Sequence, residues 1–149
     1  MIKKKIIFVS IIFFLANCGF TPIYLQNKNV NFSIEQVSYA GDRELNNFLK
    51  TKLNQYKNNK ISNKIYIEAN SVYEKSILTK NASGEATSYN IEVEIIFLIK
   101  PSNKEIIISE KKIMDSMSDK FEESQYERSI KENFASSISN KLTNKLIIN

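Results

Sequence analysis

A run with a period of two from Tyr89 to Ile99 constrains the fold more than any other feature of this sequence. Every odd-numbered residue of the run is apolar, whereas Asn90, Glu92 and Glu94 stand between them. A period of two is typical of a β-strand that buries one face and leaves the other in water. The chain must therefore supply a second layer that covers the odd-numbered side chains of this strand.

Further strands are predicted on both sides of this run. Residues 63–79 alternate in the same way at their start, with Ile65, Ile67 and Ala69 on one face. Residues 81–84 carry a turn signal that ends in Gly84, and residues 101–103 carry another before a strand from 105 to about 114. At about 3.3 Å per residue, the two strands that flank Gly84 can each reach roughly 50 Å. The sequence therefore predicts a long antiparallel hairpin.

A shorter strand is predicted over residues 31–39. Phe32 and Ile34 share one parity there, whereas Val37 and Tyr39 share the other. Because one extra residue in a strand reverses its parity, this pattern predicts either a β-bulge or two partly covered faces.

Two segments carry the spacing of amphipathic helices. Asp42 predicts the start of the first, because its carboxylate can accept hydrogen bonds from free backbone amides. Apolar residues then share one helical face as far as about residue 57: Leu45, Phe48, Leu49, Leu53 and Tyr56. The second segment has apolar residues at steps of four: Tyr126, Ile130, Phe134, Ile138, Leu142 and Leu146.

The start and the path of the second helix are predicted separately. Ser124 and Glu127 fit a capping box, in which each side chain accepts a hydrogen bond from a backbone amide of the first turn. A stripe of apolar residues at steps of four drifts around a helix, since the helix has 3.6 residues per turn. We therefore expect this helix to begin near Ser124 and to cross the sheet at an angle.

The predicted order of elements is β-α-β-β-β-α. This order favours an α+β fold, a two-layer sandwich with a mostly antiparallel four-stranded sheet and two helices packed on one face. Residues 31–149 are long enough for a single domain with one core. The helices are expected to bury the odd-numbered face of residues 89–99. The opposite face is expected to be polar except toward Ile96 and Leu98, because it carries Glu68, Asn70, Glu92 and Glu94.

The N-terminus has the layout of a lipoprotein signal. Three lysines precede an apolar run over residues 6–15, and Cys18, the single cysteine of the chain, stands just beyond it. The run has about half of the ~20 residues that a membrane-spanning helix needs. We therefore predict a signal peptide over residues 1–17, acylation of Cys18, a lipidated tether over residues 18–30 and a periplasmic domain. An ordinary signal peptide or an uncleaved anchor stays open as an alternative, since Asn17 occupies a position where Gly, Ala or Ser is usual.

The composition argues against several classes of function. The chain has no histidine, so it lacks the commonest general base and the commonest metal ligand, and its one cysteine is assigned to the anchor. No catalytic residue, metal site or cofactor is predicted. Removal of the signal peptide takes away three lysines and lowers the net charge from +5 to about +2, so the basic character does not indicate nucleic-acid binding.

Lys75 and Lys80 are the candidate ligand-binding residues. Both are predicted to lie near the tip of the long hairpin. A lysine ammonium binds phosphate as a compact point charge, so the pair suits an anionic ligand. The alternative is that both are ordinary solvated lysines of a lysine-rich protein.

The segment Cys18-Gly19-Phe20-Thr21-Pro22-Ile23-Tyr24 resembles the start of mature lipopolysaccharide-assembly lipoproteins of the LptE family. The resemblance extends over the mature chain through the order of elements, the entry Ser88-Tyr89 into the third strand and a final helix that begins near Tyr126. It implies an outer-membrane lipoprotein on the periplasmic side, with no enzymatic activity. Such a protein acts as plug and assembly factor inside a large β-barrel, LptD, and assists insertion of lipopolysaccharide into the outer leaflet.

The resemblance also implies how this chain meets its partners. The polar sheet face is expected to enter the barrel lumen, which is polar as well. No family residue is carried over for lipopolysaccharide; Lys75 and Lys80 are expected to contact its phosphates because of their predicted place near the tip of the hairpin. Gly19 agrees with an outer-membrane location, because an aspartate after the lipidated cysteine is the usual signal for retention in the inner membrane. The alternative is a lipoprotein adaptor subunit of a different envelope assembly or transport machine; a lipid-anchored hydrolase is disfavoured by the missing histidine.

Overall fold

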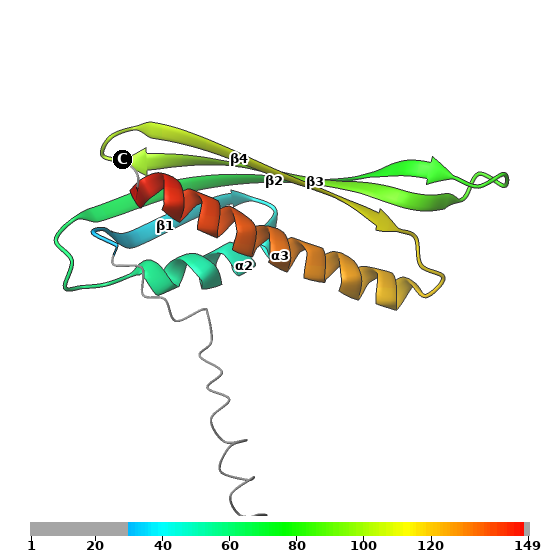
Figure 1. Ribbon diagram of the computed structural model, residues 1–149, viewed down its shortest axis with the longest axis horizontal. Helices are drawn as coiled ribbons and strands as arrows, with labels where there is room; N and C mark the ends of the chain where they lie inside the picture. The colour runs from blue at the N-terminus through cyan, green and yellow to red at the C-terminus, as the bar shows by residue number, and fades with distance from the viewer. Residues whose placement is uncertain (1–29, 148–149) are drawn as a thin grey trace, which may run out of the picture.

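Residues 30–147 are described by a computed structural model, in which a four-stranded sheet is covered on one face by two helices (Figure 1). The elements follow the predicted β-α-β-β-β-α order, with a short 3-10 helix after the first α-helix. Their bounds are β1 (Ser33–Gly41), α2 (Arg43–Leu53), η2 (Asn54–Tyr56), β2 (Lys64–Lys80), β3 (Ala86–Lys100), β4 (Lys104–Asp115) and α3 (Lys120–Ile147). The predicted α+β class is therefore confirmed.

The four strands lie side by side in the order of the chain, β1-β2-β3-β4. β1 and β2 are parallel, whereas β2 pairs antiparallel with β3 and β3 with β4, so the sheet is mixed. The parallel pair follows from the connection through α2, because a helix between two strands returns the chain to the same end of the sheet. The register of β1 shifts between Ile34 and Gln36. This bulge, the first of the two predicted alternatives, turns Val37 and Tyr39 toward the helices, where both are partly buried.

The hairpin of β2 and β3 is long, with 17 and 15 residues in its strands. β4 ends at Asp115, opposite Ser88, and beyond that point β2 and β3 pair alone as far as Lys80 and Ala86. Figure 1 shows this hairpin projecting past the helices at one end of the molecule. The Oδ1 atom of Asn81 closes its turn, accepting hydrogen bonds from backbone amides of residues 83 and 85 at 3.0 and 2.9 Å.

The core lies between the sheet and the helices. The odd-numbered residues of β3 form its floor, and Ile91, Ile95 and Phe97 have no exposed surface. Both helices contribute fully buried side chains to it: Leu45, Leu49, Ile130, Ala135, Ile138 and Leu142. Figure 1 shows α3 running at an angle to the strands, as expected from its apolar stripe. No helix within residues 30–147 combines the length and the apolar character that are needed to cross a bilayer.

The passage from β1 into α2 requires a glycine. Gly41 has a φ of +93°, and a Cβ atom added to it would lie 1.7 Å from the backbone oxygen of Ser71. That oxygen accepts a hydrogen bond from the amide of Asp42 at 3.2 Å, which ties the helix start to β2. The side chain of Asp42 accepts from the amide of Leu45 at 2.8 Å, so its predicted role as N-cap is confirmed.

The predicted start of α3 is wrong. The helix begins at Lys120, and Ser124 is an exposed residue inside it. Asp119 caps it instead, because its Oδ1 atom accepts from the amides of Phe121 at 2.7 Å and Glu122 at 3.2 Å. Glu127 does not reach back to an amide; its side chain points to the sheet, where it meets charged and phenolic partners.

Candidate functional site

Lys75, the first candidate residue, lies between the sheet and α3. It belongs to the helix-facing side of β2, opposite Ile91, and its side chain is 24% exposed. Its Nζ atom lies 2.7 Å from Oε2 of Glu127 and 3.4 Å from Oε1 of Glu123, and 4.2 Å from the centre of the Tyr89 ring. Burial acts to lower the pKa of Lys75, but the bonds to Glu127 and Glu123 outweigh it and raise this pKa above its usual value. Lys75 is therefore not an ordinary solvated lysine.

Glu123 is the centre of the contacts around Lys75. Its Oε2 atom accepts hydrogen bonds from the amide of Met117 at 3.0 Å, from Nζ of Lys120 at 3.0 Å and from the hydroxyl of Ser116 at 3.3 Å. The side chain is only 8% exposed although it is charged. The bond from the Met117 amide, followed by that from Lys120, holds the pKa of Glu123 at about 2. A negative charge in the first turn of α3 is also favourable to the helix dipole.

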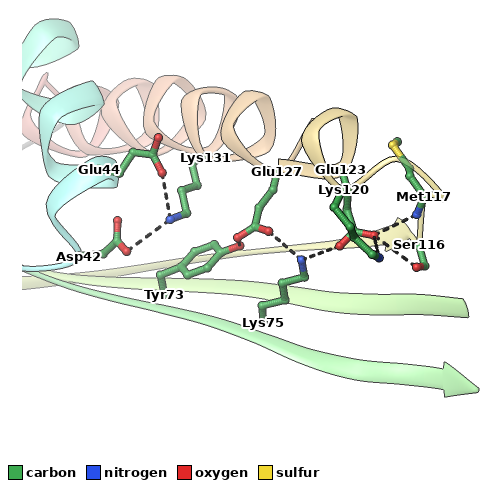
Figure 2. A network of polar contacts seen from close by, with 10 residues as sticks. All are labelled: Asp42, Glu44, Tyr73, Lys75, Ser116, Met117, Lys120, Glu123, Glu127 and Lys131. Carbon is green, nitrogen blue, oxygen red and sulfur yellow. Dashed lines mark hydrogen bonds and ion pairs between the residues drawn. The ribbon is translucent and has the colours of Figure 1, made fainter. Parts of the chain in front are cut away.

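The network continues toward α2 through an aromatic ring (Figure 2). The hydroxyl of Tyr73 donates to Oε1 of Glu127 at 2.6 Å, and burial together with this carboxylate raises the pKa of Tyr73. Nζ of Lys131 lies 4.0 Å from the centre of the Tyr73 ring. The same atom lies 3.4 Å from Asp42 and 3.2 Å from Glu44, and the Lys131 side chain is 10% exposed. Three lysines and four carboxylates thus join α3 to the sheet and to the start of α2.

The arrangement of these charges suits attachment of α3 to the sheet better than it suits catalysis. Each charged group of the network has at least one partner of opposite charge, which is what charges removed from water require. Within residues 30–147 no group of three or more Cys, Asp or Glu side chains is placed to hold a metal ion. The network therefore gives these charges a structural role, and the sequence did not predict it.

Lys80, the second candidate, is placed differently. It is the last residue of β2, pairs in register with Ala86 at the base of the turn, and is exposed. Ile77 and Leu78 precede it on the projecting part of the hairpin and are 52% and 49% exposed. The structure does not bring Lys75 and Lys80 together: the first lies under α3, the second at the tip. Whether either binds an anionic ligand stays a prediction.

The sheet face away from the helices is broad, and nothing within residues 30–147 covers it. We call it the outer face and define it by even positions 66–76 and 90–100 and odd positions 105–113. It carries the two lysines Lys100 and Lys111 and five glutamates: Glu68, Glu74, Glu92, Glu94 and Glu105. A shallow hollow of about 460 Å³ lies on it, between β1 and β4, and is lined in part by Glu68, Asn70, Ile96, Leu98 and Glu105.

The outer face is less polar than predicted. Tyr66, Val72, Ile107 and Ile113 are 44%, 55%, 48% and 58% exposed on it. Ile107 pairs directly with Ile96, so these two side chains and Leu98 form one apolar patch across β3 and β4, whereas Ile113 lies apart from it, opposite Asn90. The prediction that only Ile96 and Leu98 interrupt a polar surface was therefore wrong, because it did not include the register of β4 against β3.

Cys18, the signal peptide and all but the last residue of the predicted tether lie outside the described residues. The predicted acylation of Cys18 stays a prediction.

Comparison with known proteins gives the fold. No protein-family model matches the chain, and no curated protein matches its sequence. Among solved structures, rare lipoprotein B from Shewanella oneidensis is similar with a TM-score of 0.54 and 12% identity, over 74% of this chain and 92% of that one. A lipoprotein B from Nitrosomonas europaea has a TM-score of 0.53 and 13% identity, over 79% and 86%. A minor lipoprotein from Acinetobacter baumannii has a TM-score of 0.51 and 10% identity, over 75% and 94%.

Identities of 10–13% establish a common fold and nothing finer. The three structures are covered almost completely, so this chain has the whole of their fold rather than one part of it. This chain therefore has the fold of these three lipoproteins.

Proposed function

We propose that this chain is an outer-membrane lipoprotein of the LptE type. It would be anchored through acylated Cys18 on the periplasmic side, act as plug and assembly factor of an LptD-type β-barrel, and assist insertion of lipopolysaccharide into the outer leaflet. The observation that carries the proposal is the fold shared with three lipoproteins, joined to an N-terminal segment that ends its apolar run at a single cysteine. The role is one of binding and assembly, not catalysis.

The outer face supports a protein partner. Its apolar patch of Ile96, Leu98 and Ile107 has no cover within residues 30–147, and apolar surface of this kind marks interaction sites in soluble domains. Farther along the same face Glu74 and Glu92 stand directly opposite each other on β2 and β3. Like charges in that position destabilise a free sheet, and Nζ of Lys111, 2.5 Å from Glu92, offsets part of this repulsion. A partner surface with cationic and apolar groups would relieve both features.

The experiment is site-specific photocrosslinking in cells. A crosslinker at Asn70 or Glu92 on the outer face should capture an outer-membrane β-barrel of the LptD type. The matched control is Asn133, an exposed residue of α3 on the helical side of the molecule, which should not capture it. Equal capture from both sides, or none from the outer face, would count against this docking mode.

The identity of the captured protein separates the two candidate functions. Capture of a different envelope complex from Asn70 or Glu92 would favour the alternative function, an adaptor subunit of another envelope machine. The outer face would still be the docking surface, but its partner would not be an LptD-type barrel. Capture of a large barrel with bound lipopolysaccharide supports the LptE-type role.

The hairpin supports the glycolipid part of the proposal. Lys80 presents a free cation beside the exposed side chains of Ile77 and Leu78, a combination that suits a phosphate attached to acyl chains. Lys75 is the second proposed contact, but in the structure its ammonium group is already paired with Glu127 and Glu123. A phosphate must therefore displace these carboxylates before it can bind Lys75.

A further inference from the structure

The first ten residues of α3, 120–129, are attached to the sheet mainly by polar contacts, together with a contact between the Tyr126 ring and Nζ of Lys112 on β4. The only buried side chain among them is Glu123, whereas the buried apolar residues of the helix begin at Ile130. Phe121 and Tyr126, the two aromatic residues of this part, are 71% and 37% exposed. We call residues 120–129 the strap. The strap places no buried apolar side chain of its own in the core, so its attachment depends mainly on ion pairs and hydrogen bonds, besides the cover that it gives to the sheet beneath it.

The strap is held closed from the sheet side by two groups. Nζ of Lys75 binds both Glu127 and Glu123, and the hydroxyl of Tyr73 donates to Glu127 at 2.6 Å. Figure 2 shows both carboxylates reaching from α3 toward β2. An ion pair that is removed from water gains little net free energy, because desolvation offsets most of the attraction. A competing anion of higher charge can therefore replace these carboxylates at Lys75. Opening the strap also breaks the bond from the amide of Met117 to Glu123, so the anion must bind strongly enough to offset that loss.

The surface beneath the strap suits a particular class of competitor. Ile91 and Met114 lie there with 0% and 1% of their surface exposed, and the Tyr89 ring stacks under the ammonium of Lys75. Opening the strap would uncover an apolar strip beside a cation. That pairing fits an amphiphile that joins a phosphate group to an acyl chain, since phosphate offers three strong acceptors and the chain prefers the apolar strip.

We infer that the strap is an autoinhibitory contact: Glu123 and Glu127 occupy Lys75 in the unliganded protein, and a phosphate-bearing lipid opens the strap by replacing them. This inference rests on the proposed glycolipid contact of Lys75 and adds its regulation. Binding and opening are linked. While the strap is mostly closed, a change that weakens it and leaves the ligand contacts intact should tighten binding by the factor by which it favours opening.

The test compares binding of lipid A micelles to the full folded domain and to three variants. Glu127→Gln keeps the size of the side chain but removes its charge, and should bind about five- to tenfold more tightly than the parent. Lys75→Met should abolish the gain when combined with Glu127→Gln. Glu132→Gln is the matched control, because it removes one charge from α3 at an exposed ion pair with Lys52 and should leave the affinity unchanged.

The exchange of backbone amide hydrogens supplies a second measurement. If the network were purely structural, adding the ligand would not change the exchange rates of the strap. Micelles of lipid A should increase the exchange of amides 120–129, whereas inorganic phosphate alone or dephosphorylated lipid A should not, because the ligand needs both phosphate and acyl chain. If inorganic phosphate alone opens the strap, the ligand is a simple anion and the assignment to a lipid is overturned.

The binding results distinguish a wrong inference about the strap from a wrong proposal about the glycolipid. If the parent binds lipid A while Glu127→Gln binds equally or more weakly, the strap is structural and the glycolipid role stands. If no variant binds, both the strap and the glycolipid contact at Lys75 are overturned, and barrel capture from the outer face is unaffected.

Discussion

Glu123→Gln should destabilise the domain through the loss of one buried charge. Glutamine keeps the shape of the side chain and can still accept from the amide of Met117, so the substitution removes the charge and little else. The pKa of Glu123 is lowered from 4.5 to about 2, and each unit corresponds to about 1.4 kcal/mol. The full shift is worth roughly 3 kcal/mol. Lys120, one of its causes, is 69% exposed and screened by solvent, so we expect a loss of about 2 kcal/mol at pH 7.

The loss should depend on pH in a definite direction. A carboxylate whose pKa is lowered by folding stabilises the folded state above its ordinary pKa of 4.5, and the stabilisation disappears as the pH falls toward about 2. Urea unfolding followed by circular dichroism should therefore show the difference between parent and Glu123→Gln shrinking from about 2 kcal/mol at pH 7 to below about 1 kcal/mol at pH 3.

The neighbouring Glu122 provides the control. It lies in the same helical turn and is exposed, so Glu122→Gln should change the free energy of unfolding by less than about 0.5 kcal/mol. An equal loss in the Glu122→Gln and Glu123→Gln variants, or a loss from Glu123→Gln that is the same at pH 7 and pH 3, would refute the reasoning. The charge of Glu123 would then contribute no more than that of a solvated residue.

Three further predictions address the helix start, the anchor and the hairpin. Gly41→Ala should cost at least about 3 kcal/mol in urea unfolding, since its Cβ would overlap the oxygen of Ser71 at a positive φ; an unchanged midpoint would contradict the geometry. Mass spectrometry should find acyl chains on Cys18, and Cys18→Ala should release the protein from membranes; an unmodified N-terminus or cleavage elsewhere would exclude a lipoprotein. Lys80→Glu should weaken binding to lipid A micelles about threefold. The control is Lys60→Glu, a change at an exposed loop residue near the other end of β2, which should not weaken binding. If Lys80→Glu binds as tightly as the parent at low salt, the hairpin tip is not part of the binding site.

The structure also changes the result that we expect from the substitution Lys75→Glu. If Lys75 were solvated, Lys75→Glu would reverse a charge without affecting folding. In the structure that carboxylate would face Glu123 and Glu127 and would leave both without the ammonium that now pairs with them, so the variant should unfold more easily. Lys75→Met, which only removes the charge, is the more informative change for binding.

The sequence alone determined the order and type of the elements, because both follow from local periodicity. The alternation of residues 89–99 specifies which side of β3 is buried, and the spacing of Leu45, Leu49 and Leu53 specifies the inner face of α2. Asp42 was identified as an N-cap for the same reason, since a cap and the amides it binds are three residues apart. The start of α3 was missed although it is also local. Asp119 and Glu122 have the same spacing as Ser124 and Glu127, so the sequence offered two capping boxes and the second was chosen.

Only the tertiary structure decided which charges are free and which are paired. Lys75 and Lys80 are five positions apart on one strand and look alike in sequence, yet one is bound by carboxylates 48 and 52 residues away and the other is exposed. The exposed patch around Ile107 was hidden for the same reason, since it depends on the register between β3 and β4. Periodicity is a property of the backbone over a few residues, whereas the partner of a side chain depends on how distant elements pack. The sequence therefore predicted the scaffold and the anchor, and packing determined the strap and the chemistry of the outer face.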